Sequence, residues 1–137
     1  LDPFNADALG AYGKWLWHQP DVDASEGYFL RALEQDPESL SRYADLGNFY
    51  GNSGQRDKAL EVDADIQERF STSLQKAVAF LEVARIHELV GNLDVGIAWA
   101  IRSRAADPEF PDALWMLAEL YARIGDEEGT RYFDPDL

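Results

Sequence analysis

The chain has 137 residues, of which 46% are hydrophobic and 12% aromatic, and its formal net charge is −14. These values predict one globular domain with an apolar core and exclude an intrinsically disordered chain. The absence of cysteine excludes disulfides and thiolate catalysis. The acidic excess argues against nucleic acid and anionic membranes as partners, and no apolar run reaches the ~18 residues of a membrane helix.

Asp-Pro pairs mark an internal repeat. Pro3 and Pro37 each close such a pair and lie 34 residues apart, and a third pair ends at Pro108, 71 residues after Pro37. The second step equals two periods of 34 residues plus three extra residues, which we place in the Ser/Thr cluster between residues 69 and 74. A period of this length predicts a repeat architecture.

Three columns of equivalent positions support this register. Two columns hold only small side chains, and the column between them holds only turn-forming residues. The small columns are Gly13, Gly47, Ala84 and Ala118, and then Ser25, Ala59, Gly96 and Thr130. The turn column is Pro20, Gly54, Gly91 and Gly125. Small residues on both sides of a turn predict closely crossing helix pairs, because large side chains would force the helix axes apart.

Apolar residues between these columns recur every three or four positions, which is the period of a helix. In chain order we expect helices at 6–18, 22–35, 38–52, 55–69, 73–90, 93–106 and 109–124, followed by a short remnant. Asp36 and Asp57 are predicted to cap the third and fourth helices. The stretch GNFYGNSGQRDKAL (residues 47–60) is therefore interpreted as a turn and a helix start, not as a ligand-binding loop. The predicted fold class is all-α.

The first two repeats carry a known residue pattern. The second has YADLGNFY at residues 43–50 followed by Ala59, and the first has Phe29, Ala32 and Pro37. On these residues the chain resembles the tetratricopeptide repeat (TPR) family, whose pattern is W-x2-L-G-x2-Y, then A-x3-F-x2-A, then P. The resemblance implies a right-handed α-solenoid of antiparallel helix pairs in a single domain over residues 1–137. Its three and a half repeats would be 6–37, 40–71, 74–108 and a partial 109–137.

Some positions depart from the pattern, namely Asp63, Ile66, Ser71 and His87. Half-TPR and pentatricopeptide repeats therefore remain alternatives. Pentatricopeptide repeats bind RNA at one base per repeat, and the net charge of −14 argues against that activity. The interrupted last helix at Asp134-Pro135 favours a fragment of a longer array, with an improvised cap formed by Tyr132, Phe133 and Leu137 as the other interpretation.

We find no sequence pattern for catalysis, a cofactor or a metal. The chain has only two histidines, His18 and His87, and no HExxH, phosphate-binding or nucleophile-elbow motif. His18 is expected at a helix end, and His87 is expected to be a hydrogen-bonded core residue. The prediction is that the protein is not an enzyme and has no metal or cofactor.

The TPR resemblance implies a concave groove, lined by the first helix of each pair, that binds an extended peptide or a partner protein. Groove positions hold Lys14, Asn48 and Arg85 in one row, flanked by Trp17 and Trp115. An asparagine amide can pair with a peptide backbone, Lys and Arg can bind carboxylates, and tryptophans provide apolar hot spots. These five residues are the predicted peptide-binding site.

An alternative is that these groups serve only the fold. Lys14 and Arg85 would then pair with acids such as Glu82 and Glu88, and Trp17 would pack beneath the next repeat. Trp15 and Trp99 are predicted to be core residues. One TPR subgroup grips a C-terminal carboxylate, and its clamp positions are here Gly10, Lys14, Asp45, Val78 and Glu82. None keeps the clamp's residue type, so binding to acidic-tailed chaperones is not expected.

The predicted function is a protein–protein interaction scaffold that binds a protein or peptide, without nucleic acid binding or membrane insertion. Two alternatives stay open. One is a structural protein that forms homo-oligomers through its solenoid ends. The other is a regulatory segment of a larger enzyme. No compartment follows from the sequence, although the cytoplasm is slightly favoured.

Overall fold

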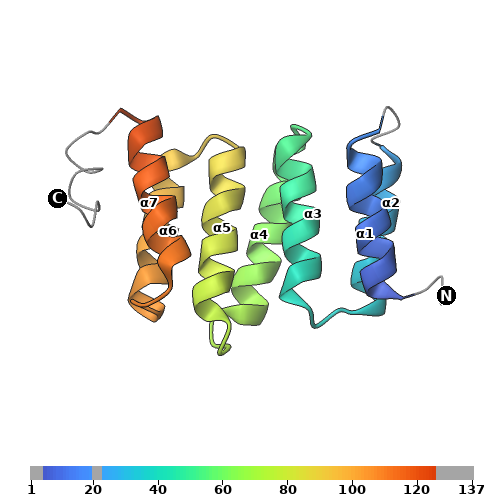
Figure 1. The fold of residues 1–137 in the computed structure, drawn as a ribbon, viewed down its shortest axis with the longest axis horizontal. Coiled ribbons are helices and arrows are strands. Elements are labelled where there is room, and N and C mark those ends of the chain that lie inside the picture. Colours follow the sequence, from blue (N-terminus) through green and yellow to red (C-terminus); the bar gives the residue numbers. More distant parts are fainter. Residues whose placement is uncertain (1–4, 20–22, 126–137) are drawn as a thin grey trace. The chain divides into compact units, whose positions relative to one another are not determined.

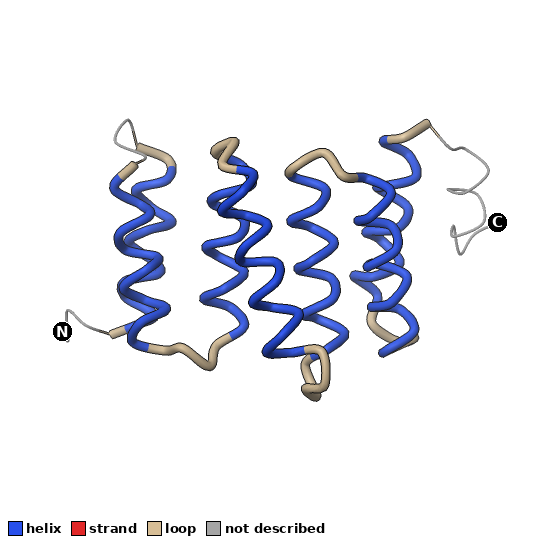
Figure 2. Tube along the Cα trace, turned by 180° about the vertical axis from the view of Figure 1, so that it is seen from behind, coloured by secondary structure: helices blue, strands red, loops and turns tan. Residues whose placement is uncertain are grey.

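A computed structural model describes residues 5–19 and 23–125, and these contain seven α-helices and no strand (Figures 1 and 2). The helices are α1 (Ala6–Trp17), α2 (Ala24–Gln35), α3 (Leu40–Asn52), α4 (Arg56–Phe70), α5 (Lys76–Leu89), α6 (Leu93–Ala106) and α7 (Pro111–Arg123). The all-α prediction is confirmed, and each predicted helix boundary lies within three residues of the observed one. The predicted remnant, the C-terminal cap and Pro20 lie outside the described residues.

The predicted caps of α3 and α4 are wrong. Asp36 ends α2, where its backbone N–H donates to the carbonyls of Ala32 and Leu33, and α3 begins later with Ser39 as its N-cap. Asp57 lies inside the first turn of α4. An acidic side chain there still complements the helix dipole, so the charge pattern was informative although the cap positions were not.

The chain divides into two compact units with a boundary inside α4, and unit 1 ends at Val62. In unit 1, α1 pairs with α2, and α2 packs against α3. A Cβ on Gly13 would lie 3.0–3.3 Å from the ring of Phe29. The predicted small residue at position 13 is therefore needed for the close approach of α1 and α2. The Phe29 ring, which is fully buried, also lies 5.6 Å from that of Phe49 on α3.

Unit 2 begins at Asp63 and contains the helix pair α5 and α6, with α7 packed against both. A Cβ on Gly96 would lie 3.2 Å from the carbonyl oxygen of Ala84, which again confirms the need for small residues at the helix crossing. The central apolar cluster of this unit comprises Leu81, Ala84, Ile97, Ala100, Ala113, Met116, Leu117 and Leu120.

The core of unit 2 also contains a polar pair. His87 Nε2 lies 2.7 Å from Asp63 Oδ2, and the other carboxylate oxygen accepts a hydrogen bond of 2.8 Å from Gln67 Nε2. Both Asp63 and His87 are buried. The expectation of a hydrogen-bonded core histidine is confirmed. Two departures from the TPR pattern, 24 positions apart in the sequence, are thus each other's partners.

The turn column also behaves as predicted. Gly54, Gly91 and Gly125 follow the first helices α3, α5 and α7, and all three have positive φ values, between 75° and 88°. This backbone conformation is costly for any residue with a Cβ. The extra three residues form part of the turn between α4 and α5, over residues 71–75, as expected. None of the described helices has the length and apolar character needed to cross a bilayer.

Candidate functional site

In unit 1, the predicted site residue Lys14 is already paired. Its Nζ lies 3.2 Å from Asp45 Oδ1 on α3. Arg42 contacts the other Asp45 oxygen at 3.5 Å and also forms an ion pair with Asp7. A Cβ on Gly10 would collide with the Arg42 guanidinium, so this glycine leaves room for the arginine to lie across α1. Lys14 therefore pairs with an acid, as the alternative interpretation held, but this acid is Asp45 and not Glu82 or Glu88.

Trp17 is a packing residue of unit 1. Its ring lies 6.2 Å from that of Phe29 and 5.6 Å from that of Phe49, with edge-to-face geometry in both contacts. Such pairs are favourable beyond the area they bury. The side chain is half-buried, so most of its surface is used by the contact between α1, α2 and α3, as the alternative interpretation of Trp17 held.

Asn48, the third predicted residue in unit 1, is also half-buried, on α3. Its amide oxygen is buried and has no hydrogen-bond partner among the described residues. A buried polar atom without a partner costs free energy, so this amide has hydrogen-bonding capacity that the fold does not use.

In unit 2, the predicted site residues are Arg85 on α5 and Trp115 on α7. The Arg85 side chain is half-buried and forms no ion pair with any residue in the described ranges 5–19 and 23–125. Glu88, one of its predicted partners, instead lies 3.1 Å from Arg123 on α7. Trp115 is 71% exposed. We call the surface of α5 and α7 that carries these two residues the α5–α7 face.

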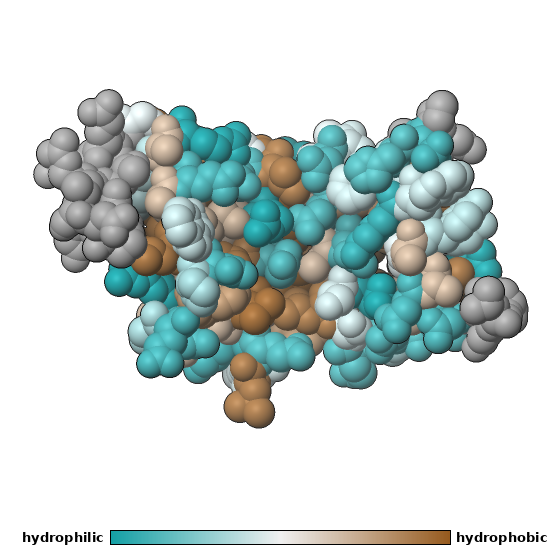
Figure 3. All heavy atoms as spheres, in the orientation of Figure 1, coloured by the Kyte–Doolittle hydropathy of each residue, from teal (hydrophilic) through white to brown (hydrophobic). Residues whose placement is uncertain are grey.

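In unit 2, α7 lies in front of α6 in the view of Figure 1. Figure 3 shows this side with hydrophobic atoms gathered around α5 among hydrophilic ones. The two helices are held together beneath the surface by Leu81, Met116 and Leu117, which are buried in the apolar cluster. Buried apolar residues therefore pack together the two helices that carry the candidate residues.

Two other tryptophans were predicted to lie in the core. Trp99 is partly buried against the unit 2 cluster, where its ring contacts Phe80 at 5.4 Å and the Arg102 guanidinium at 4.4 Å. Trp15 is 55% exposed, so its core prediction is wrong. The helical period placed it correctly on an apolar stripe of α1, but no described helix covers that stripe.

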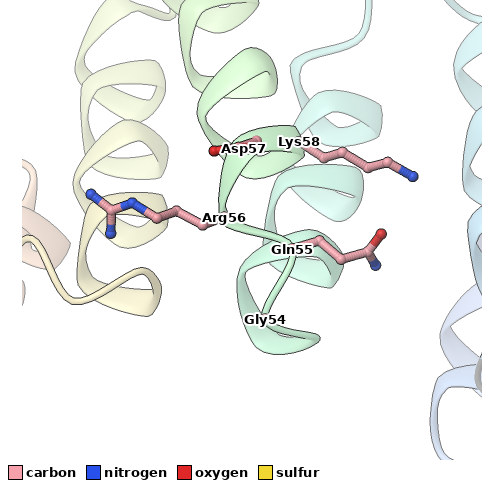
Figure 4. Close-up of a pocket in the computed structure, with 5 residues that line it drawn as sticks. All are labelled: Gly54, Gln55, Arg56, Asp57 and Lys58. Atoms are coloured by element: carbon pink, nitrogen blue, oxygen red, sulfur yellow. The ribbon is translucent and has the colours of Figure 1, made fainter.

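The turn before α4 forms a shallow pocket of about 300 Å³, lined by residues 54–58. Figure 4 shows that the side chains of Arg56 and Lys58 extend in opposite directions from this turn. Lys58 Nζ lies 3.5 Å from Glu26 Oε1 and 5.4 Å from the centre of the Tyr50 ring. Burial, followed by the nearby carboxylates Glu26 and Glu61, raises the pKa of Tyr50. Cations that diverge do not form a ligand-binding loop, which supports the turn interpretation of this stretch.

A second pocket in unit 2 was not found by sequence reasoning. Its volume is about 380 Å³, and it lies between the α4–α5 and α6–α7 turns. The lining residues are Thr72, Ser73, Leu74, Lys76, Ala77, Val78, Ala106, Asp107 and Phe110. Leu74, which is fully exposed, was the available signal, because it is an apolar residue inside a polar Ser/Thr turn. The described residues contain no group of three or more potential metal ligands.

Comparisons with known proteins identify structures with a similar fold. No known family model matches the chain. A pentatricopeptide repeat-containing protein of Arabidopsis thaliana is 34% identical over 109 residues, which cover 74% of this chain and 11% of that protein. The structure of PilF from Pseudomonas aeruginosa superimposes with a TM-score of 0.71 at 14% identity, over 96% of this chain and 59% of that one.

The structure of PilW, described as a widely conserved type IV pilus biogenesis factor, gives a TM-score of 0.68 at 22% identity, over 96% of this chain and 60% of that one. The chain thus spans about a tenth of the curated relative and about three-fifths of each solved structure. PilF and PilW contain TPRs, and pentatricopeptide repeats are a related helical repeat. The helices of the described residues, the columns of small and turn residues and these similarities agree, and the chain has a TPR-like, all-α solenoid fold of helical repeats.

Proposed function

We propose that this protein is a non-enzymatic interaction module that binds an extended peptide or a segment of a partner protein on its first-helix faces. The observation that carries the proposal is the α5–α7 face, where an arginine without an ion pair and a largely exposed tryptophan lie on neighbouring helices. Arg31 and Arg102 also have no ion pair among the described residues, but both are exposed, whereas Arg85 is half-buried. Partly buried arginines normally have an anionic partner.

The chemistry of this face defines the ligand. The Arg85 guanidinium can bind a carboxylate through two parallel hydrogen bonds. Trp115 offers a large, rigid apolar surface of the kind that contributes most to binding free energy. We therefore expect a segment with an acidic side chain or C-terminal carboxylate close to an apolar side chain. On the first-helix face of unit 1, considered by itself, Asn48 can form a hydrogen bond to a peptide backbone, whereas Lys14 and Trp17 contribute less because the fold already uses them.

A phage-displayed library of random peptides tests this proposal. We expect selection on the native chain to enrich peptides that combine an acidic and an apolar residue. The Arg85→Glu variant should lose about tenfold or more in affinity for the enriched peptides, with unchanged helical circular dichroism and Tm. Arg102→Glu is the matched control, because it makes the same charge change on α6 of the same unit. Equal affinity of Arg85→Glu and native chain would exclude this site.

RNA binding is a second candidate, favoured by the match to a pentatricopeptide repeat-containing protein. Repeats of that class read one base each, but binding to nucleic acid depends on cations that neutralise phosphates. This chain has 12 basic and 26 acidic residues. Fluorescence anisotropy with random single-stranded RNA at low salt separates the candidates. Saturable, salt-sensitive binding would replace the peptide proposal, and we expect none.

Self-assembly through the ends of the array is the remaining alternative. Sedimentation velocity over a range of concentrations separates it from the peptide proposal, because an assembly-forming chain would shift to larger species as its concentration rises. We expect a monomer throughout, since like-charged chains repel each other.

A further inference from the structure

The pocket between the α4–α5 and α6–α7 turns of unit 2 has an apolar lining that the fold leaves accessible. Its volume is about 380 Å³, and pockets that bind ligands begin at about 300 Å³. Among the residues that line it, Leu74 is fully exposed, Val78 is 41% exposed, and Phe110 is half-buried. The buried Ala77 also lines it. The pocket therefore has room and apolar contacts for a side chain that comes from a ligand.

Two polar side chains of the same pocket are already used by its turns. Ser73 Oγ and Asp107 Oδ1 each accept a hydrogen bond from the backbone N–H two residues later, at 2.9 Å and 3.1 Å. Lys76 differs, because it is exposed and has no ion pair among the described residues. Together with Arg85, this cation favours an acidic ligand over a basic one.

Helical geometry connects this pocket to the α5–α7 face. Val78 lines the pocket, and Arg85 lies seven residues later in the same helix, α5. Positions seven apart lie on one side of a helix, because two turns contain about 7.2 residues. A rise of about 1.5 Å per residue separates them by about 10 Å along the helix axis. A ligand that is bound to Arg85 and runs along α5 therefore reaches the pocket.

An acidic residue of α5 lies between these two positions. Glu82 follows Val78 by four residues and precedes Arg85 by three, so it lies on the same side of the helix. Its side chain is half-buried. A carboxyl group there disfavours an acidic residue in the middle of the ligand, because like charges that face each other are costly. The acid of the ligand is therefore expected at Arg85, with uncharged or basic residues between it and the pocket.

We propose that this pocket binds an apolar side chain of the same peptide that Arg85 holds by an acidic side chain. An extended peptide advances by about 3.3 Å per residue, so a distance of about 10 Å corresponds to about three residues. The acid and the apolar anchor of the peptide are therefore separated by two or three intervening residues. This inference rests on the proposed function, because it requires a peptide on the α5–α7 face, and it adds a second subsite and a fixed spacing.

Peptide libraries of defined spacing test this inference. Each phage library carries one glutamate and one phenylalanine, in either order, separated by zero to six random residues. Selection on the full chain should enrich the libraries with two or three intervening residues by about tenfold or more over those with none or six. Equal enrichment of all spacings overturns the inference.

Variants of the pocket provide a second measurement on the enriched peptides. Val78→Asn should weaken their binding by about tenfold, and Leu74→Ser, which alters a fully exposed side chain, should weaken it by about threefold or more. Both variants should keep the circular dichroism and Tm of the native chain. Val95→Asn is the matched control and should have no effect, because it makes the same change at a 42% exposed position of α6.

The position of the bound phenylalanine can also be measured directly. An enriched peptide with a photoreactive diazirine on this ring should label residues 72–78 or 106–110 of the chain, as mapped by mass spectrometry. Labelling confined to other residues overturns the inference.

These outcomes separate the pocket from the proposed function. Enriched peptides that lose affinity for Arg85→Glu, but bind Val78→Asn and Leu74→Ser as tightly as the native chain, exclude the pocket and leave the proposed function standing. If no library is enriched, both are overturned.

Discussion

The first-helix faces of the two units use their predicted site residues in opposite ways. In unit 1, Lys14 is neutralised by Asp45, and Trp17 packs against two phenylalanine rings. In unit 2, Arg85 has no ion pair among the described residues, and Trp115 is largely exposed. The repeat pattern aligns Lys14 with Arg85 but does not determine whether a side chain is used within the fold. The binding proposal rests on these unused groups of unit 2.

The two units also differ in how deeply they bury their polar side-chain pairs. Unit 1 places Asp7 and Lys14 at the protein surface, where water screens their ion pairs with Arg42 and Asp45. Unit 2 buries Asp63 and His87 in its core. A buried charge that loses its partner is costly, whereas a surface charge is resolvated. This contrast, together with the contrast between the tryptophans, gives three stability predictions.

The largest effect is expected when the buried pair is broken. Asp63→Ala leaves the His87 imidazole without its main partner in an apolar core and should lower the free energy of unfolding by about 3 kcal/mol. Asp7→Ala, the matched change in unit 1, should cost less than about 1 kcal/mol. Urea unfolding monitored by circular dichroism measures both. The double variant Asp63→Leu/His87→Phe should recover much of the loss, since apolar replacement of both partners is often neutral. Equal losses for the two single variants would show that burial does not distinguish the units.

The stability losses on replacing Trp17 and Trp115 should differ by a smaller amount. Trp17→Ala removes the ring that joins Phe29 and Phe49 and should cost about 2–3 kcal/mol, which is below the usual value for a fully buried tryptophan. Trp115→Ala should cost less than about 0.5 kcal/mol, because most of that side chain already contacts solvent. Thermal unfolding of both variants measures the difference. If Trp115→Ala is the more damaging change, the α5–α7 face is part of the core and not a binding surface.

The smallest effects are expected at two fully buried serines, and they should have opposite signs. In unit 2 the Ser103 hydroxyl donates to the Ala77 carbonyl at 2.6 Å. In unit 1 the Ser25 hydroxyl has no hydrogen-bond partner among the described residues. Ser103→Ala should destabilise by about 1 kcal/mol, whereas Ser25→Ala should be neutral or stabilising by up to about 1 kcal/mol. Comparison of the two Tm values tests this. Destabilisation by Ser25→Ala would mean that its hydroxyl does have a partner.

Most of the backbone could be predicted from the sequence, because the 34-residue period, the small columns and the turn glycines are local signals that repeat. Gly91 shows this well, since its place in the turn column predicted a turn, and the structure has a turn there in which Gly91 has a positive φ value. The caps at Asp36 and Asp57 could not be placed as well, because several Asp and Ser residues near each helix start compete for the same role.

The candidate site was less predictable. The column of Lys14, Asn48 and Arg85 follows from the repeat, but the pairing of Lys14 with Asp45 depends on side-chain conformations across two helices. The exposure of Trp15 depends on whether a neighbouring helix covers it, which periodicity within one helix cannot show. The partnership of Asp63 and His87 could have been suspected from a simple signal, namely two polar residues at core positions in consecutive helices.

In unit 1, the Arg42 side chain acts as an intramolecular ligand of the α1 surface beside Gly10. Because Gly10 has no Cβ, the Arg42 guanidinium from α3 can lie against α1 at this position. It is placed there between the carboxylates of Asp7 and Asp45. A tethered group of this kind is present at a high effective concentration. A cationic ligand from solution must therefore compete with Arg42 for those carboxylates, and an acidic ligand must compete with the carboxylates for Arg42. Any ligand that used these groups would therefore have to displace an internal competitor.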